Sequence, residues 1–286
     1  MPHRKVHIGC VVSIFFAFIS SFEAAGQSID RTTIDSSGRH VVIPKQISRV
    51  LAAGPPASVL LYTLAPQKMI GWVRAPTTAE KPFLLESVRE LPEYGRITAR
   101  GGPTNLNRVL ESRPYLIIDV GEAYISLAND VQAQTQVPYL LFDGTLEKTP
   151  KIYRLLGDLL DVKDRAEALA RYAESVLRNT ALLRTEKQAT RPRLYVARGP
   201  SGLETRRAGS MTLEVLEHVG ASILTASEGN PQSVSPEQIA SWDPHTVLAL
   251  DSQFYISAQS DLRWRSIRGC SGAAHFFGAQ IAFWLA

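Results

Sequence analysis

Residues 105–118 read NLNRVLESRPYLII, and residues 235–250 read SPEQIASWDPHTVLAL. Each stretch begins with a short helical segment, continues through a proline and ends in an apolar run typical of a buried parallel strand. In both, seven positions separate Asn107 or Glu237 from the proline that follows. The repeated unit predicts two related α/β lobes. The alternative is chance similarity, which is common between two helix–strand units.

A helical segment lies between the two copies of this unit. Leucine and alanine side chains recur at helical spacing through residues 149–189, and no glycine or proline occurs from Asp158 to Gln188. The polar run at 161–164 is expected to separate two helices, with Asp164 capping the second. A long helix between two lobes makes a stiff connection, which limits closure of the lobes to a small rocking motion.

The first lobe reads as strands that alternate with helices. Weak alternation through residues 29–43, around a Ser-Gly pair, indicates a short hairpin. A strand is expected at 49–53, a helix at 57–64 and a further strand at 68–73. This order is typical of a mainly parallel sheet.

The N-terminus has the pattern of an export signal. Arg4 and Lys5 precede an apolar stretch at 8–22, and the small residues 24–26 supply a cleavage site. A membrane anchor is the alternative, but it needs about 20 apolar residues, and this run is shorter and interrupted by serines. We therefore expect a cleavable signal peptide at 1–25 and a mature protein in the periplasm.

Charge and cysteine content exclude several function classes. The formal net charge of +4 comes from 31 basic and 27 acidic residues without a basic run, so no nucleic-acid partner is expected. Cys10 lies in the leader and Cys270 near the end, which leaves no internal disulfide or thiolate metal cluster in the mature chain. The histidines are scattered, so a site for a bare metal ion is not expected.

Five motifs occur in an order that resembles one transport family. They are residues 47–50 (ISRV), 91–96 (LPEYGR), 105–118, the helical segment at 149–189, and 234–239 (VSPEQI). Together they resemble the substrate-binding proteins of iron-siderophore and cobalamin (Fe/B12) ABC importers, over residues 34–267. The resemblance implies a class III periplasmic binding protein, in which two Rossmann-like lobes are joined by a long rigid helix.

The resemblance also suggests domain boundaries and partners. The implied parts are a signal peptide at 1–25, an N-terminal lobe at 26–148, an interlobe helical segment at 149–189, a C-terminal lobe at 190–268 and an atypical tail at 269–286. Such a protein captures a metal chelate (iron-siderophore, corrinoid or haem) between its lobes and delivers it to an ABC permease with its ATPase subunits. It works as a monomer, needs no cofactor and meets the membrane only through the permease.

In this family one surface carboxylate on each lobe docks to the permease. Glu237 matches the position on the second lobe, whereas the first-lobe position is Asn107 in this chain. Glu111, one helical turn further on, could substitute for it. The alternative for Glu237 is a solvated carboxylate near a helix N-terminus.

Candidate ligand contacts follow from the fold class, because ligands of open α/β sheets bind beyond the carboxyl ends of the strands. Guanidinium groups there can bind carboxylate or catecholate oxygens, and aromatic rings can form flat apolar walls. For each aromatic the alternative is core packing, and for each arginine it is a solvated surface. The candidates are Gly54, Trp72, Arg74, Tyr94, Arg96, Glu122, Tyr124, Arg198, Glu204, Arg206 and Tyr255.

Two other function classes are alternatives to the importer. Residues 199–202 (GPSG) lack the Gly-x-Ser-x-Gly frame of a nucleophile turn, and no His–Asp pair follows them at a suitable place, so catalysis is not expected. A sensor or adhesion module that binds a partner protein with the same lobes remains open.

The end of the chain departs from the family pattern. Residues 264–267 still follow it, but 269–277 (GCSGAAHFF) do not. A reading frame shifted by one nucleotide near Arg268 can encode the proline-containing aromatic segment that the family has there. We therefore predict a frameshift and a truncated second lobe that lacks one strand and its closing helices, with apolar surface exposed as a result.

Overall fold

The structure is a computed structural model of the 286-residue chain, and it describes residues 30–97, 106–121, 125–181, 191–206, 208–225, 232–265, 267 and 276–278. The expected signal peptide at 1–25 lies outside the described residues. Within them, no helix combines the length and the apolar character that crossing a bilayer requires.

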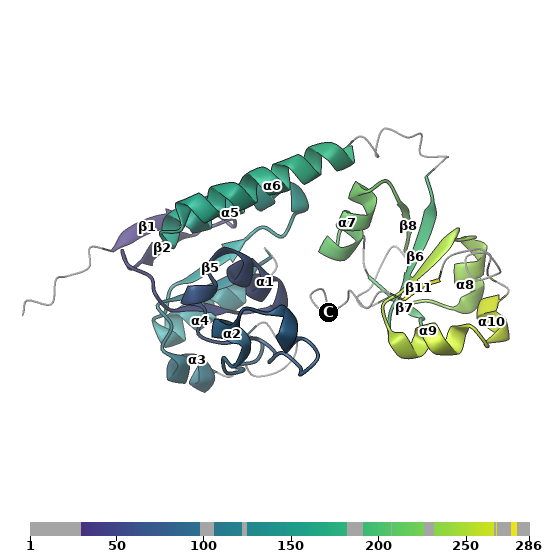
Figure 1. The fold of residues 1–286 in the computed structure, drawn as a ribbon, viewed down its shortest axis with the longest axis horizontal. Coiled ribbons are helices and arrows are strands. Elements are labelled where there is room, and N and C mark those ends of the chain that lie inside the picture. The colour runs from purple at the N-terminus through teal and green to yellow at the C-terminus, as the bar shows by residue number, and fades with distance from the viewer. Residues whose placement is uncertain are drawn as a thin grey trace, which may run out of the picture.

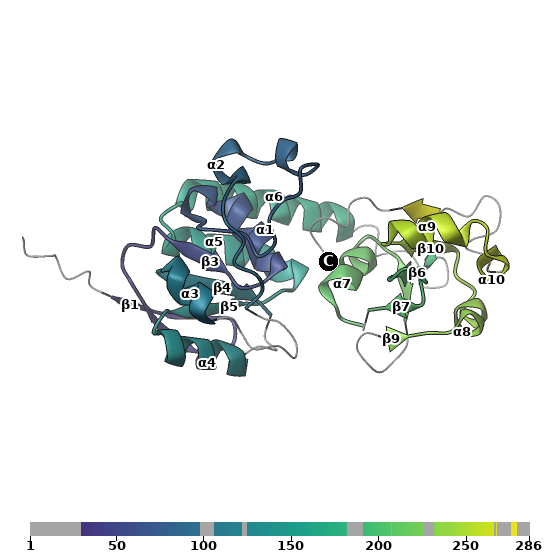
Figure 2. The same cartoon turned by 90° about the horizontal axis from the view of Figure 1, so that it is seen from below.

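The N-terminal lobe is built on a parallel sheet with strand order β3-β4-β5 (Figures 1 and 2). An antiparallel hairpin, β1-β2, precedes it, as the alternation at 29–43 predicted. The elements are β1 (Arg31–Ile34), β2 (His40–Ile43), β3 (Val50–Ala52), α1 (Pro55–Leu64), η1 (Pro66–Lys68), η2 (Lys81–Phe83), α2 (Glu86–Arg89), α3 (Leu106–Ser112), β4 (Leu116–Val120), α4 (Ile125–Thr135), β5 (Tyr139–Phe142), η4 (Leu146–Lys148), α5 (Thr149–Leu159) and α6 (Lys163–Ala181).

Both faces of this sheet are covered by helices, because successive side chains of a strand point to opposite faces. Leu116 and Ile118 pack with α1, α5 and the start of α6, whereas Ile117 between them packs with α3 and α4. All three side chains are fully buried. Burial on both faces explains why the strand reads as a continuous apolar run.

Helix α6 begins in the N-terminal core and continues beyond it. Ala166 and Ala170 are buried, but no residue of the helix after Ala170 is. The second half of α6 runs toward the C-terminal lobe in Figure 1. The break between α5 and α6 is where the sequence placed it, although Asp164 is the second residue of α6 and not its cap.

The C-terminal lobe is built on a second parallel sheet, with strand order β11-β10-β6-β8. Its core is aromatic: the Phe254 and Trp264 rings meet edge to face at 4.6 Å, and Tyr195 stacks on Trp264 at 6.3 Å. The elements are β6 (Arg193–Ala197), β7 (Glu204–Thr205), α7 (Met211–His218), β8 (Ser222–Leu224), β9 (Gln232–Ser233), α8 (Pro236–Ser241), β10 (Thr246–Ala249), α9 (Ser252–Ala258), α10 (Leu262–Arg265) and β11 (Phe276–Gly278).

The repeated sequence unit folds alike in both lobes. Arg113 and Asp243, which precede the two matching prolines, both have φ near +45°, a conformation that is uncommon outside glycine. An arginine at the start of the neighbouring strand holds each of them. Arg49 Nε donates to the Arg113 carbonyl at 2.9 Å, and Arg193 forms an ion pair with the Asp243 carboxylate. The two-lobed α/β prediction is confirmed.

Two predicted features of the fold are corrected. The strand expected at 68–73 forms only isolated bridges, at Met69 and Trp72. The second lobe does not lack an edge strand there, because β11, in the atypical tail, pairs in parallel with β10. Phe276 and Phe277 are aromatic residues of the kind that strands favour, whatever the origin of the tail. The domain boundaries and the frameshift remain predictions.

Candidate functional site

The carboxyl ends of the N-terminal strands place backbone turns at one edge of the lobe. Gly54 lies two residues after the end of β3 and is the N-cap of α1, with extended backbone dihedrals and a buried position. The Ile97 N–H donates to the Ala53 carbonyl at 2.9 Å, which attaches the segment at 94–97 to the end of β3. Gly54, Tyr94 and Arg96 therefore lie in one region of the lobe, and their role as ligand contacts stays a prediction.

Arg74 lies on an exposed loop that carries its own polar network. Its guanidinium donates to both carboxylate oxygens of Glu80, at 2.6 and 3.2 Å, while 55% of the side chain stays exposed. The Ala75 N–H donates to Glu93 Oε2 at 2.8 Å. Burial alone would raise the pKa of Glu80, but its hydrogen bonds with Arg74 and Thr77 outweigh burial and lower it. Arg74 therefore shapes the loop as well as facing solvent.

Three predicted aromatic walls are used mainly for packing. Trp72 is 3% exposed, and its indole N–H donates to the Val88 carbonyl at 2.8 Å, so the structure places it in the core. Tyr94 is half-buried against the core between the sheet, α3 and α4. Tyr255 lies within α9 instead of a loop, half-buried against the C-terminal core. The packing alternative describes all three better than a free ligand wall does.

Asp119 is a buried carboxylate near the end of β4 that the sequence analysis missed. Only 2% exposed, it accepts hydrogen bonds from the Val120 N–H at 2.8 Å and from the Tyr139 hydroxyl at 3.1 Å. Burial raises its pKa to about 6, against those two hydrogen bonds and the positive charge of Arg96. A strongly shifted pKa beside a candidate rim marks a residue worth testing.

Asp143 directly follows β5, and its pKa is shifted downward, in the direction opposite to the shift of Asp119. It forms an ion pair with Lys148 and accepts from the Thr145 N–H at 2.8 Å. Burial would raise the pKa of Asp143, but these partners outweigh burial and lower it to about 2. Asp143 is therefore ionised at neutral pH and holds the turn that leads into η4.

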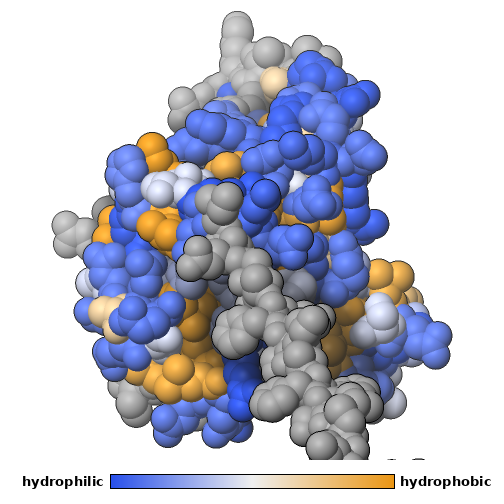
Figure 3. Space-filling view, turned by 90° about the vertical axis from the view of Figure 1, so that its left-hand side faces the viewer, coloured by the Kyte–Doolittle hydropathy of each residue, from blue (hydrophilic) through white to orange (hydrophobic). Residues whose placement is uncertain are grey.

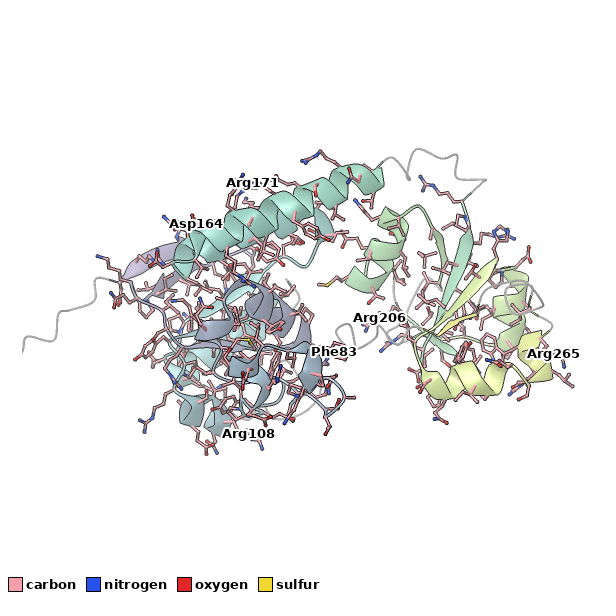
Figure 4. All side chains as sticks on the ribbon, viewed as in Figure 1. Phe83, Arg108, Asp164, Arg171, Arg206 and Arg265 are labelled. Carbon is pink, nitrogen blue, oxygen red and sulfur yellow. The ribbon has the colours of Figure 1, made fainter. Side chains whose placement is uncertain are left out.

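The C-terminal rim is a hairpin-like turn after β6. The backbones of Arg198 and Glu204 exchange two hydrogen bonds, at 2.8 and 3.2 Å, across a turn that contains Gly199 and Gly202 at φ +71°. Both glycines are needed, because Gly199 lies against the Glu204 carboxylate and Gly202 against the Phe254 ring. Arg206 follows directly, on the side of the C-terminal lobe nearer the N-terminal lobe (Figure 4).

The remaining predicted residues divide into two groups. Glu122 and Tyr124 lie outside the described residues. Glu237 is exposed in the first turn of α8, where its backbone N–H and the Ser235 hydroxyl lower its pKa. The other two docking candidates are Asn107 and Glu111, both exposed on α3.

One surface hollow lies on the N-terminal lobe, and no residue at the carboxyl ends of β3, β4 or β5 lines it. It encloses about 320 Å³ between β2 and α4. Figure 3 shows that the end of the molecule carrying the N-terminal lobe is mainly hydrophilic, with smaller hydrophobic areas. Among the residues that the structure describes, no group of three or more His, Cys, Asp or Glu side chains is placed to hold a metal ion.

The two lobes also touch through α7. Glu214 Oε1 accepts from the Leu146 N–H at 2.8 Å, at the start of η4. The Met211 methyl group lies close to Gly144, where a Cβ atom would be only 3.0 Å from it. A carboxylate of one lobe thus satisfies an N–H group at a helix start of the other.

Replacing Glu214 by Ala is expected to loosen this contact between the lobes. The substitution removes one partly buried, charge-assisted hydrogen bond, so we expect a wider distribution of interlobe distances and little loss of global stability, about 1–2 kcal/mol. Distance measurements between spin labels at exposed positions on the two lobes would test this. Glu217→Ala, one helical turn further along α7, is the control, and equal distributions in both variants would contradict the expectation.

Comparison with solved structures shows what kind of protein has this arrangement. An ABC transporter solute binding protein from Sulfurospirillum deleyianum matches 85% of this chain and 79% of its own length, with 25% sequence identity and a TM-score of 0.77. The chain has the fold of a periplasmic solute-binding protein of ABC transporters. This agrees with the resemblance drawn from the sequence motifs.

Two further solute-binding proteins are similar. The molybdate periplasmic binding protein of Haemophilus influenzae is 18% identical, with 86% of this chain and 82% of that chain covered and a TM-score of 0.71. A periplasmic heme binding protein from Pseudomonas aeruginosa is 22% identical, with 78% and 80% covered and a TM-score of 0.60. No protein-family model matches the sequence, and no curated protein matches it.

Proposed function

We propose that this solute-binding fold serves an ABC importer and captures a metal chelate between its two lobes. The candidate ligands are an iron-siderophore, a haem or a corrinoid. The observation that carries the proposal is the similarity of the whole chain to an ABC transporter solute binding protein, with 25% sequence identity and a TM-score of 0.77. The shared arrangement is two lobes, each with a parallel sheet, connected through α6.

The charges on the two rims support an anionic ligand. Arg96 on the N-terminal lobe is exposed, and Arg198 and Arg206 on the C-terminal lobe are partly exposed. Guanidinium groups bind carboxylate and catecholate oxygens through two hydrogen bonds at once. The heme and molybdate neighbours show that this fold accepts both chelates and small oxyanions.

The permease is the proposed partner, reached by the monomeric protein in the periplasm. The exposed carboxylates of Glu237 on α8 and Glu111 on α3 are the proposed docking groups, and Asn107 stands beside Glu111 on the same short helix. Because the similar structures are transport proteins, we propose no catalytic role. Export through a cleavable leader at 1–25 belongs to the same proposal.

Titration calorimetry on the mature exported chain tests the proposal. We expect haemin, a ferric tris-catecholate or cyanocobalamin to bind with a dissociation constant of about 1 μM or tighter, which corresponds to ~8 kcal/mol. Failure of all three to bind would contradict the importer function. Binding of molybdate alone would keep the solute-binding role and contradict the chelate.

An arginine variant locates the site. Arg206→Gln is expected to weaken chelate binding at least about tenfold, because a charge-assisted hydrogen bond to the ligand is worth ~1.5–3 kcal/mol and ~1.4 kcal/mol is a factor of ten. Arg265→Gln is the matched control, since Arg265 is exposed at the outer end of the C-terminal lobe (Figure 4). Equal affinities of the two variants would place the ligand away from Arg206.

A further inference from the structure

Phe83 is the large hydrophobic side chain with the greatest exposure among the described residues, at 87%. The next residue, Leu84, is 5% exposed, and Val88 is 1% exposed; both belong to the N-terminal core. The chain therefore turns Phe83 outward at the end of η2 and the next residue, Leu84, inward.

The segment that carries Phe83 is fastened on both sides. Before η2, Glu80 accepts from Arg74 and from the Thr77 N–H. After η2, the Leu85 N–H donates to the Tyr62 hydroxyl at 3.2 Å. Lys81 also forms an ion pair of 2.7 Å with Glu90. Because the backbone on both sides of Phe83 is held before binding, little backbone entropy is lost when a ligand covers the ring.

The position of Phe83 fits a ligand rim. In the sequence, Phe83 follows Trp72 and Arg74, and these come after Met69, which forms a bridge with β3 of the N-terminal sheet. In space, Phe83 lies at the edge of this lobe that is nearer the C-terminal lobe (Figure 4). Trp72 and Tyr94, the aromatic residues predicted on this rim, are occupied by core contacts. Tyr124, also predicted on this rim, lies outside the described residues, and among the described aromatic residues of this rim Phe83 is the most exposed.

We propose that Phe83 is an aromatic ligand contact and that the ligand therefore presents a flat apolar face. A haem or a catecholate chelate has such a face, and a bare oxyanion has none. The proposal rests on the proposed solute-binding function and specifies its substrate class. It also assigns the aromatic wall to a residue different from those that sequence patterns suggested.

Affinities of Phe83→Ala for haemin, a ferric tris-catecholate and molybdate test the inference in the mature chain. We expect the variant to bind the chelate recognised by the parent about tenfold more weakly, as for the loss of one aromatic contact and its buried area. Phe83→Trp should retain the affinity, because it keeps the ring. Tyr172→Ala, which removes a 70% exposed ring from α6, is the control and should bind as the parent does.

The outcomes separate this inference from the proposed function. Chelate binding that is equal in Phe83→Ala and the parent would overturn the role of Phe83 and leave the importer function standing. Binding of molybdate alone would contradict the proposal that the ligand has a flat apolar face, and with it this inference. Failure of the parent to bind any of these probes or cyanocobalamin would overturn the proposed function itself. Unchanged thermal unfolding of Phe83→Ala is expected, because the ring is 87% exposed.

Discussion

Asp119→Asn is expected to raise the free energy of unfolding at pH 7 by up to about 3 kcal/mol. The pKa of Asp119 is about 6 in the folded chain, against 3.8 for an unperturbed aspartate, and each unit of that difference corresponds to about 1.4 kcal/mol. Because the folded pKa is raised, the stability linked to the protonated carboxyl is fully present below pH 3.8 and is lost as the pH rises through 6. Asparagine keeps the shape and removes the buried charge.

Urea unfolding at several pH values between 4 and 7 measures this effect. The parent should lose stability over that range through Asp119, and the variant should lose less by an amount that grows with pH. Asp130→Asn, at an exposed position on α4, is the matched control. The same pH dependence in Asp119→Asn and the parent would mean that the carboxylate is solvated or differently paired.

Gly157→Ala is expected to lower the stability of the chain by roughly 2–3 kcal/mol, as overpacking of a tight core does. A Cβ atom at Gly157 would lie 2.1 Å from the Cβ atom of Ala166, where α5 crosses α6. Helix propensity alone predicts the opposite sign, a gain of about 1 kcal/mol. The sign of the change therefore reports whether the two helices are in contact at this point.

A double-mutant cycle sharpens this result. Ala166→Gly creates the missing space, so Gly157→Ala in that background should cost less than it does alone, by at least ~1 kcal/mol. Chemical denaturation of the four chains gives the coupling energy. Additive effects of the two substitutions would contradict the close crossing of α5 and α6.

The fold could be predicted from sequence because its signals are periodic and local. The repeat around Asn107 and Glu237 gave the two lobes, and the helical spacing through 149–189 gave α5 and α6. The conformation of Arg113 and Asp243 at φ near +45° extends this repeat to the backbone. Where a strand is held only by bridges, as at Met69 and Trp72, apolar character alone overstated its regularity.

The candidate site was harder to predict because the residue type does not determine whether a side chain is buried or exposed. Trp72 and Phe83 are both aromatic residues of the N-terminal lobe, yet one is 3% exposed and the other, in η2, is 87% exposed. Asp119 gave no signal either, since an aspartate inside an apolar run could equally mark the end of a strand. Only the neighbours that each side chain meets in three dimensions separate a core residue from a contact surface.

The second half of α6, in which no residue is buried, acts as a lever. Residues 171–181 extend about 16 Å beyond the last buried residue of the helix, so a bend of about 5° at the root would displace the far end by roughly 1.4 Å. Arg154 of α5 forms an ion pair of 2.7 Å with Glu167 in the first half of α6 and one of 2.6 Å with Glu174 in its second half. The angle between the lobes is therefore set partly by these Arg154 ion pairs, which lie on the surface of the N-terminal lobe. Because surface ion pairs are screened by salt, ionic strength could change the angle between the lobes, and with it ligand capture, without any contact with the ligand.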